Sequence, residues 1–410
     1  MTVKHLSIIK CLSERFHSGN IIYCHWKSNE HLYASVAGLT DLDILVNRNQ
    51  INEIEQILSS LGFKRFEVNA LRKYTAIDDF FAIDPETGVL VHLHLHYRLV
   101  LGERFLKGYH LPWEKYILER RQLDKETGLY IIDPNLEAIL LLIRTALKFR
   151  TRDRLHRSKD NLAETDFVRE MKWISKRINY SVLAENIQTL IGKEYQDQII
   201  NAIETGENPT ELLQNLKQEI NIYRFNLPLK ANLIRWLREL YMLLTLVSKK
   251  YLKMKIAYNR VSPRGGSVIV FLGADGSGKS TVTGQLIKWL SKKIDVELIY
   301  FGSGDGPGSI ARSILHKFAR LSSWFFRVAG KNKVITDNAT SLPGKNKVIT
   351  DNATSLPGKK QENFRLTNQI KEIGKIIYSL SLAQEKKRKL KKMWFAKGRG
   401  CLVICDRYPQ

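Results

Sequence analysis

The segment Gly-Ala-Asp-Gly-Ser-Gly-Lys-Ser, residues 273–280, has the residue types and the spacing of a phosphate-binding loop. It fits the pattern G-x-x-x-x-G-K-[ST], in which glycines let the backbone bend so that its N–H groups point at phosphate oxygens. In that pattern the lysine reaches the β- and γ-phosphates, and the hydroxyl after it ligates Mg²⁺. The spacing therefore predicts a site for ATP and Mg²⁺ made by Gly273, Ala274, Asp275, Gly276, Ser277, Gly278, Lys279, Ser280 and Thr281.

The segments on both sides of the loop have the pattern that such a site requires. The apolar run 267–273 predicts a buried strand before the loop, and 280–293 predicts a helix whose positive dipole end favours phosphate. Further strands are predicted at 296–302 and 401–406, so the alternation of strands and helices predicts a parallel sheet with crossover helices. A glycine-rich turn that matches by chance is the alternative, and the two flanking elements count against it.

Asp406, Arg407 and Tyr408 follow the last of these apolar runs, at the end of a strand where α/β enzymes bind their ligands. Together with the loop, this triplet resembles the thymidylate kinase family of nucleoside monophosphate kinases. The resemblance covers about 267–308 and 365–410, with an insertion at about 309–362. It implies a P-loop phosphotransferase that depends on ATP and Mg²⁺.

The same resemblance implies roles for individual residues. Lys279, Asp406 and Arg407 would be catalytic, and Ser280 and Asp406 would hold the metal. Asp275 and Arg407 would bind the acceptor, because a guanidinium group can donate two hydrogen bonds to one phosphate. A surface ion pair between Asp406 and Arg407 is the alternative.

Two features of this part of the sequence differ from the family pattern: the turn at 302–309, which would help to bind the acceptor, and the end of the domain. Residues 302–309, Gly-Ser-Gly-Asp-Gly-Pro-Gly-Ser, replace the family's Arg-Glu-Pro-Gly turn. The acceptor is therefore predicted only as a small molecule with a phosphate or a hydroxyl group. The family's lid and next strand would follow Tyr408, so the domain is expected to be incomplete and its turnover poor.

A second candidate site lies nearer the N-terminus. Asp41 and Asp43 flank Leu42 at the start of the strand predicted at 42–46, so their carboxylates share one face and can hold a divalent metal against a triphosphate. Residues 20–100 resemble the nucleotidyltransferase superfamily. That resemblance implies an α+β domain that either transfers nucleotides or has become a binding domain.

His92, His94 and His96 share one face of the strand predicted within 89–100. Two interpretations stay open: a metal site, or a strand whose polar face is exposed to solvent. The metal interpretation requires bound Zn²⁺ or Mn²⁺.

The chain divides into four predicted parts. They are a nucleotidyltransferase-like domain, a helical extension, a polar linker and the kinase-like domain, at 1–134, 135–258, 259–266 and 267–410. Within the insertion, residues 330–343 recur unchanged at 344–357, which indicates a tandem duplication in a tolerant surface segment.

Two basic segments bear on binding partners. The helix predicted at 310–330 combines aromatic residues and leucines with four basic residues, which suits peripheral contact with a membrane, although a core helix is the simpler interpretation. Residues 386–399 carry eight basic residues, which we interpret as the solvated face of a helix. No nucleic-acid partner is therefore expected, and the sequence makes no prediction of the oligomeric state.

The composition is that of an ordinary globular protein apart from its charge. Of the 410 residues, 44% are hydrophobic, and 65 Lys+Arg against 41 Asp+Glu give a net charge of +24. Such a surplus favours anionic ligands such as nucleotides. The four cysteines form no CxxC pair, and neither a signal peptide nor a membrane span is evident, so a cytoplasmic protein is predicted.

The sequence thus predicts a two-part phosphotransferase. One alternative is a nucleotide-binding regulatory module without transfer. Another is a nucleotidyl- or sugar-modifying transferase, because the two-domain layout also resembles proteins of surface-polysaccharide synthesis, which implies a sugar or glycan acceptor.

Overall fold

The computed structural model describes most of the chain between residues 5 and 406. The described residues are 5–69, 71–103, 106–148, 161–206, 209–248, 251, 259–274, 276–301 and 358–406. They form two compact units, which we call unit 1 (within 1–264) and unit 2 (within 265–410). The helix predicted at 310–330 and the tandem repeat lie outside the described residues, as do Asp275 and Arg407.

Unit 1 is built on a mixed sheet of seven strands with the order β3-β4-β5-β2-β1-β9-β8. The pairs β2–β5 and β1–β9 are parallel, and the other neighbours are antiparallel. A separate antiparallel pair joins β6 to β7. The strands of unit 1 are β1 (Tyr23–His25), β2 (Leu42–Val46), β3 (Lys64–Phe66), β4 (Ile77–Ile83), β5 (Leu90–His96), β6 (Leu99–Leu101), β7 (Tyr109–Leu111), β8 (Gln122–Leu123) and β9 (Tyr130–Ile131).

Strand alternation divides the side chains of the sheet between its two faces. Val91, Leu93 and Leu95 of β5 belong to a buried core with side chains of α1 (Ser7–Ser18) and α3 (Ile51–Ser60). The histidines between them therefore face the opposite side. The predicted strands at 42–46 and within 89–100 are confirmed by β2 and β5.

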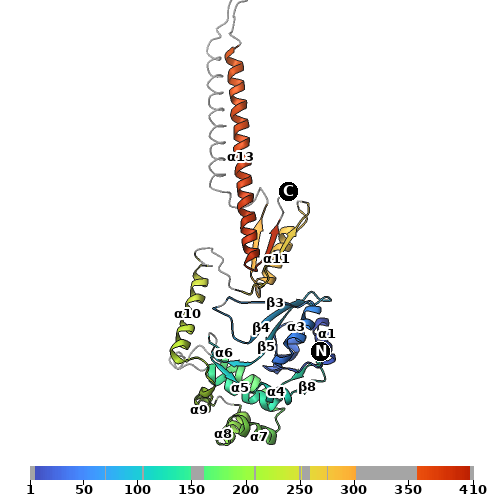
Figure 1. Ribbon diagram of the computed structural model, residues 1–410, viewed down its shortest axis with the longest axis vertical. Coiled ribbons are helices and arrows are strands. Elements are labelled where there is room, and N and C mark those ends of the chain that lie inside the picture. Colours follow the sequence, from blue (N-terminus) through green and yellow to red (C-terminus); the bar gives the residue numbers. More distant parts are fainter. Residues whose placement is uncertain are drawn as a thin grey trace, which may run out of the picture. The chain divides into compact units, whose positions relative to one another are not determined.

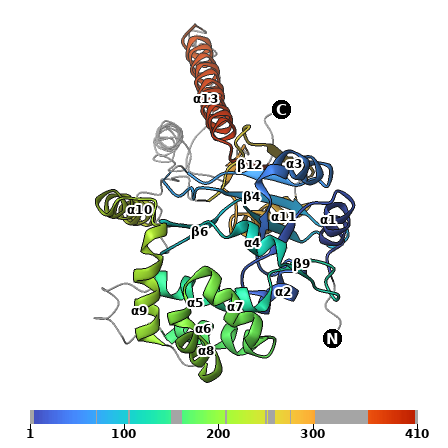
Figure 2. The ribbon, with the colours of Figure 1, turned by 60° about the horizontal axis from the view of Figure 1, so that its bottom comes forward.

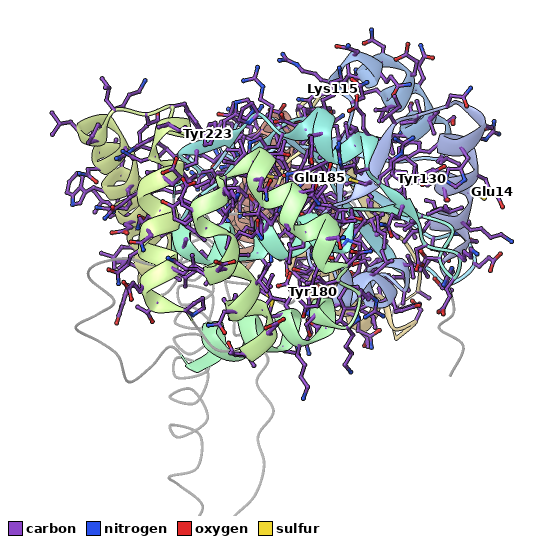
Figure 3. The ribbon with its side chains drawn as sticks, turned by 90° about the horizontal axis from the view of Figure 1, so that it is seen from below. Glu14, Lys115, Tyr130, Tyr180, Glu185 and Tyr223 are labelled. Carbon is purple, nitrogen blue, oxygen red and sulfur yellow. The ribbon has the colours of Figure 1, made fainter. Side chains whose placement is uncertain are left out.

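Helices form a second core beside β1, whose Cys24 is buried in it. Figure 2 shows α5 to α9 gathered in this helical layer. Figure 3 looks onto the same side, where Lys115 and Glu185 lie with exposed side chains. The remaining helices of unit 1 are α2 (Leu32–Val36), α4 (Glu114–Glu119), α5 (Pro134–Lys148), α6 (Asn161–Ser175), α7 (Tyr180–Leu190), α8 (Gln196–Thr205), α9 (Thr210–Glu219) and α10 (Pro228–Val247).

Local chemistry explains where the central helix α5 begins. Asp133 Oδ1 accepts hydrogen bonds from the backbone N–H groups of Asn135 and Leu136, which the first turn of a helix cannot satisfy itself. Pro134 occupies the first helical position, where a missing N–H costs nothing. The helix then buries nearly every residue to Leu147, so it forms the centre of the helical core.

Unit 2 contains a three-stranded parallel sheet with the order β10-β12-β11. Its strands and helices are β10 (Val268–Phe271), α11 (Lys279–Leu290), β11 (Val296–Tyr300), α13 (Gly358–Gly398) and β12 (Leu402–Asp406). The predicted parallel arrangement of these strands is confirmed. The chain as a whole is therefore mixed α/β.

The long helix α13 packs on β11 and β12 with its C-terminal part and runs well past the sheet (Figure 1). Met393 is buried and contacts Cys405 of β12, whereas the neighbouring Trp394 and Phe395 are exposed. Leu382 and Leu390 are partly buried, so they lie on the same inward side of the helix as Met393. Among the described residues, no helix is both long and apolar enough to cross a membrane.

Candidate functional site

The phosphate-binding loop predicted at 273–280 connects β10 to α11. Gly273, Gly276 and Gly278 have φ angles of +153°, +84° and +79°, a conformation that strains residues with a Cβ atom. The space where a Cβ would lie is open at Gly276 and Gly278, so a ligand can approach the backbone there. The glycines therefore shape a backbone cradle at the helix N-terminus.

Lys279 is the first residue of α11, and its ammonium group turns back over the loop. Nζ donates to the carbonyl oxygens of Gly273, at 2.7 Å, and of Ala274, and lies 3.3 Å from Ser277 Oγ. The side chain is only partly buried, so these bonds can be exchanged for bonds to a phosphate at small net cost.

Ser280 and Asp406 meet beside the loop, because β10 and β12 are parallel neighbours and their carboxyl ends lie at one edge of the sheet. Ser280 Oγ donates to Asp406 Oδ2 at 2.8 Å. Asp406 is 5% exposed, and its Oδ1 has no hydrogen-bond partner among the described residues. These oxygen donors fit Mg²⁺, which prefers oxygen ligands. Asp275 and Arg407, which were predicted to bind the acceptor, lie outside the described part of the chain.

A second cluster lies in unit 1, on the face of the sheet opposite α1 and α3. The register of β4, β5 and β2 places Asp79, His94 and Asp43 side by side across three neighbouring strands. His92 and His96 lie on the same face of β5, one alternation away on each side. The tertiary fold therefore gathers carboxylates and imidazoles from three strands.

His94 is the centre of this cluster. Its Nδ1 lies 3.2 Å from Asp43 Oδ1, and its Nε2 lies 3.0 Å from Asp79 Oδ1. His96 Nε2 lies 3.0 Å from the same oxygen of Asp43. Two imidazole nitrogens thus converge on one carboxylate oxygen.

His92 links the remaining carboxylates. Its Nδ1 lies 2.9 Å from Asp41 Oδ1, and its Nε2 lies 2.8 Å from Asp79 Oδ1. Asp41 and Asp43 share one face, as predicted. His92 and His96 are only 3% and 5% exposed, so the interpretation of an exposed polar strand face is wrong.

Burial and mutual pairing shift the pKa values in the cluster. Burial opposes ionisation of Asp43, but Lys27 and the hydrogen bonds from His94 and His96 outweigh it and hold its pKa well below the usual range. Burial disfavours the charged form of His94, yet Asp43 and Asp79 on either side raise its pKa to about 9. Burial lowers the pKa of His96. At neutral pH Asp43 and Asp79, whose pKa values are both lowered, are therefore ionised, and His94 between them carries a positive charge.

The cluster opens into a cavity of about 370 Å³ lined by Asp43, His94 and His96. Burial, and then the neighbouring Lys27, lower the pKa of Lys107 to about 8. Positive charge is therefore crowded at this cavity, and a bound anion would relieve the crowding. The basic residues that line it are Lys27, Arg72, Lys73, Lys107, Arg144, Lys148, Arg238 and Arg260.

Sequence reasoning missed Asp79, Arg260 and this basic lining. Arg260 Nε lies 2.9 Å from Asp79 Oδ1, although Arg260 belongs to the predicted linker 259–266. The one available signal for Asp79 is an acid within an apolar strand, because a buried carboxylate needs partners. Which partners it meets depends on the pairing of β4 with β5, which is a tertiary property.

Comparisons with known proteins were made for the whole chain. No family model matches it, and no curated protein matches it. A solved structure, the crystal structure of JHP933 from Helicobacter pylori, matches with 15% sequence identity and a TM-score of 0.23. That match covers 60% of this chain and 97% of the other. Similarity at this level carries no argument about function.

Proposed function

We propose that unit 2 is an ATP- and Mg²⁺-dependent phosphotransferase of the thymidylate kinase type, with a P-loop fold and a small phosphate- or hydroxyl-bearing acceptor. The observation that carries the proposal is the hydrogen bond of 2.8 Å between Ser280 and Asp406 beside the glycine-rich loop. It brings a hydroxyl and a buried carboxylate together where the loop and α11 would hold the phosphates.

Each described residue has a physical task in this proposal. The loop N–H groups bind the phosphate oxygens and fix the direction of the chain of phosphates. Lys279 exchanges its carbonyl partners for the β- and γ-phosphates and supplies positive charge to the transferred group. Ser280 and Asp406 would hold Mg²⁺, which, when bound, neutralises the charge that develops on the β- and γ-oxygens.

The test is ATP binding and ADP release by the full chain and by Lys279→Ala. Loss of the charged hydrogen bonds to phosphate should weaken ATP binding about ten- to hundredfold. Lys288→Ala is the matched control, since Lys288 is an exposed lysine of the same helix, and it should bind ATP like the wild type. Equal binding by all three proteins would overturn the proposal.

A screen of acceptor molecules distinguishes the proposed phosphotransferase from the two alternative functions. ADP release should appear first with nucleoside monophosphates and then with hydroxyl-bearing sugars. ATP binding without ADP release under any acceptor would favour a regulatory nucleotide-binding module. Activity that survives Lys279→Ala but is lost in Asp41→Ala would favour a nucleotidyltransferase-like unit 1, which the convergence of Asp41 and Asp43 on one face supports.

A further inference from the structure

Three side chains that line the cavity of unit 1, Asp43, His94 and His96, have the donor types of a metal site. Two imidazole nitrogens, from His94 and His96, lie 3.2 Å and 3.0 Å from Asp43 Oδ1. Ligands at ~2.05 Å from a tetrahedral ion are ~3.3 Å from one another. The two separations from the carboxylate oxygen match this spacing, and all three ligand atoms lie within 4.8 Å of one another, so one ion can reach all three.

The surroundings hold these ligands in the required orientation. His94 Nε2 lies 3.0 Å from Asp79 Oδ1, so its N–H can donate there and leave Nδ1 free for an ion. Arg260 Nε, 2.9 Å from the same oxygen, fixes Asp79 in turn. The ring of Trp26 packs edge-on against His96, with 5.1 Å between centroids.

We propose that Asp43, His94 and His96 bind one divalent transition-metal ion, with Zn²⁺ preferred over Mg²⁺, whose open coordination positions face the cavity. Imidazole nitrogen is a good ligand for Zn²⁺ and a poor one for Mg²⁺, which keeps to oxygen. Three protein ligands leave at least one position for a bound molecule, the arrangement of catalytic rather than structural zinc sites. All three ligands line the cavity of about 370 Å³, so that position is accessible.

A second set of donors, Asp41, His92 and His94, lies next to the first. This set is the weaker candidate for two reasons. His94 Nε2 is 3.8 Å from Asp41, and it would have to leave Asp79 to bind an ion there. Asp41 and His92 also do not line the cavity, so an ion between them would lack the open side.

The experiment is a titration of Zn²⁺ into the untagged, metal-free full chain in a Cys11→Ser background, which removes an exposed thiol. One ion per chain should bind, and excess Mg²⁺ should not displace it. Asp43→Asn and His96→Gln should weaken Zn²⁺ binding by about a hundredfold or more, and Asp79→Asn by about ten- to hundredfold through the loss of orientation. Asp41→Asn is the matched control and should bind like the parent.

Two outcomes would overturn the inference. One is a parent chain that binds Zn²⁺ no more tightly than Mg²⁺. The other is a reversed variant pattern, in which Asp41→Asn loses the ion and a folded Asp43→Asn keeps it. If the ligand variants do not fold, hydrogen exchange on the parent chain decides: Zn²⁺ should protect β2 and β5, and protection elsewhere instead would contradict the site. Because these readouts need no ATP, they are independent of the proposed phosphotransfer.

Discussion

The buried carboxylate of Asp84 connects α1 to the sheet of unit 1 through hydrogen bonds. Asp84 Oδ1 accepts from Ser7 Oγ at 2.7 Å and from the backbone N–H of Ile8 at 2.9 Å, which caps α1. Asp84 Oδ2 accepts from the backbone and the hydroxyl of Thr87, which closes the turn between β4 and β5. One side chain therefore satisfies four donors from two elements.

The turn between β8 and β9 has the same Asp–Thr hydrogen bonds and offers a matched control for Asp84. Asp124 accepts from the backbone and the hydroxyl of Thr127 in the same way. Asp84→Ala should lower the free energy of unfolding by about 2–4 kcal/mol, because it leaves the buried backbone N–H of Ile8 and the partly buried hydroxyl of Ser7 without this acceptor. Asp124→Ala should lower it by about 1 kcal/mol. Chemical denaturation of both variants measures the difference, and equal losses would contradict the role of Asp84 as a cap of α1.

The same carboxylate predicts acid sensitivity. Burial opposes its ionisation, but the hydrogen bond from Ile8, followed by those from Ser7 and Thr87, lowers its pKa from 3.8 to about 2. The folded-state pKa is depressed, so this stabilisation is fully present above pH 3.8 and is lost as the pH falls toward about 2. Asp84→Asn should therefore flatten the pH dependence of stability in that window relative to the wild type.

At the scale of elements, the cavity of unit 1 is lined by residues from the sheet, from loops and from helices. Lys107 comes from the connection between β6 and β7, Lys148 from the last turn of α5, and Arg238 from α10. Each of these segments contributes only one or two basic side chains to the lining. Burial, and then the positive charges that meet at this cavity, lower the pKa of Lys107 and Lys148.

This charge predicts anion binding that depends on pH. Inorganic pyrophosphate with EDTA present should stabilise the chain by about 2 kcal/mol at ~30 times its dissociation constant, measured by denaturation at pH 6.5. The effect should fall as the pH rises through about 8, because Lys107 then loses its proton and its charge. Lys107→Met should weaken it, whereas Lys115→Met, at an exposed site on α4, should not. Identical behaviour of the two variants would refute an anion site at the cavity.

At the scale of the whole molecule, two units carry two separate candidate chemistries. Unit 2 presents oxygen donors and a glycine-rich loop, and unit 1 presents imidazoles, carboxylates and a basic cavity. A ligand of one unit should stabilise that unit first, since a ligand protects the structure it binds.

Segment-resolved hydrogen exchange tests this separation. ATP with Mg²⁺ should slow exchange in 268–290 of unit 2. Lys279→Ala should abolish that protection, whereas Asp43→Asn should keep it. Protection by ATP confined to unit 1 would contradict the proposed phosphotransferase and move the nucleotide site to the N-terminal unit.

The features that could be predicted from the sequence are those that depend on residues close together in the chain. The strand and helix on either side of 273–280 were predictable because an apolar run, a glycine-rich turn and a helical pattern follow one another directly in the sequence. The strands β2, β5, β10, β11 and β12 were predictable because short apolar runs and alternation specify strands. Asp41 and Asp43 share a face for the same reason, since alternation needs no partner strand.

Only the tertiary structure decided which chemical groups meet. Asp79 and His94 lie opposite each other because β4 pairs with β5 in one register, and a shift by one residue would turn either side chain to the other face. Arg260 reaches the same cluster from a segment whose sequence indicates only a linker. The pairing of Ser280 with Asp406 likewise depends on the placement of β12 beside β10, across more than a hundred residues of chain. Such contacts arise from packing and strand order, which residue types and spacing alone do not specify.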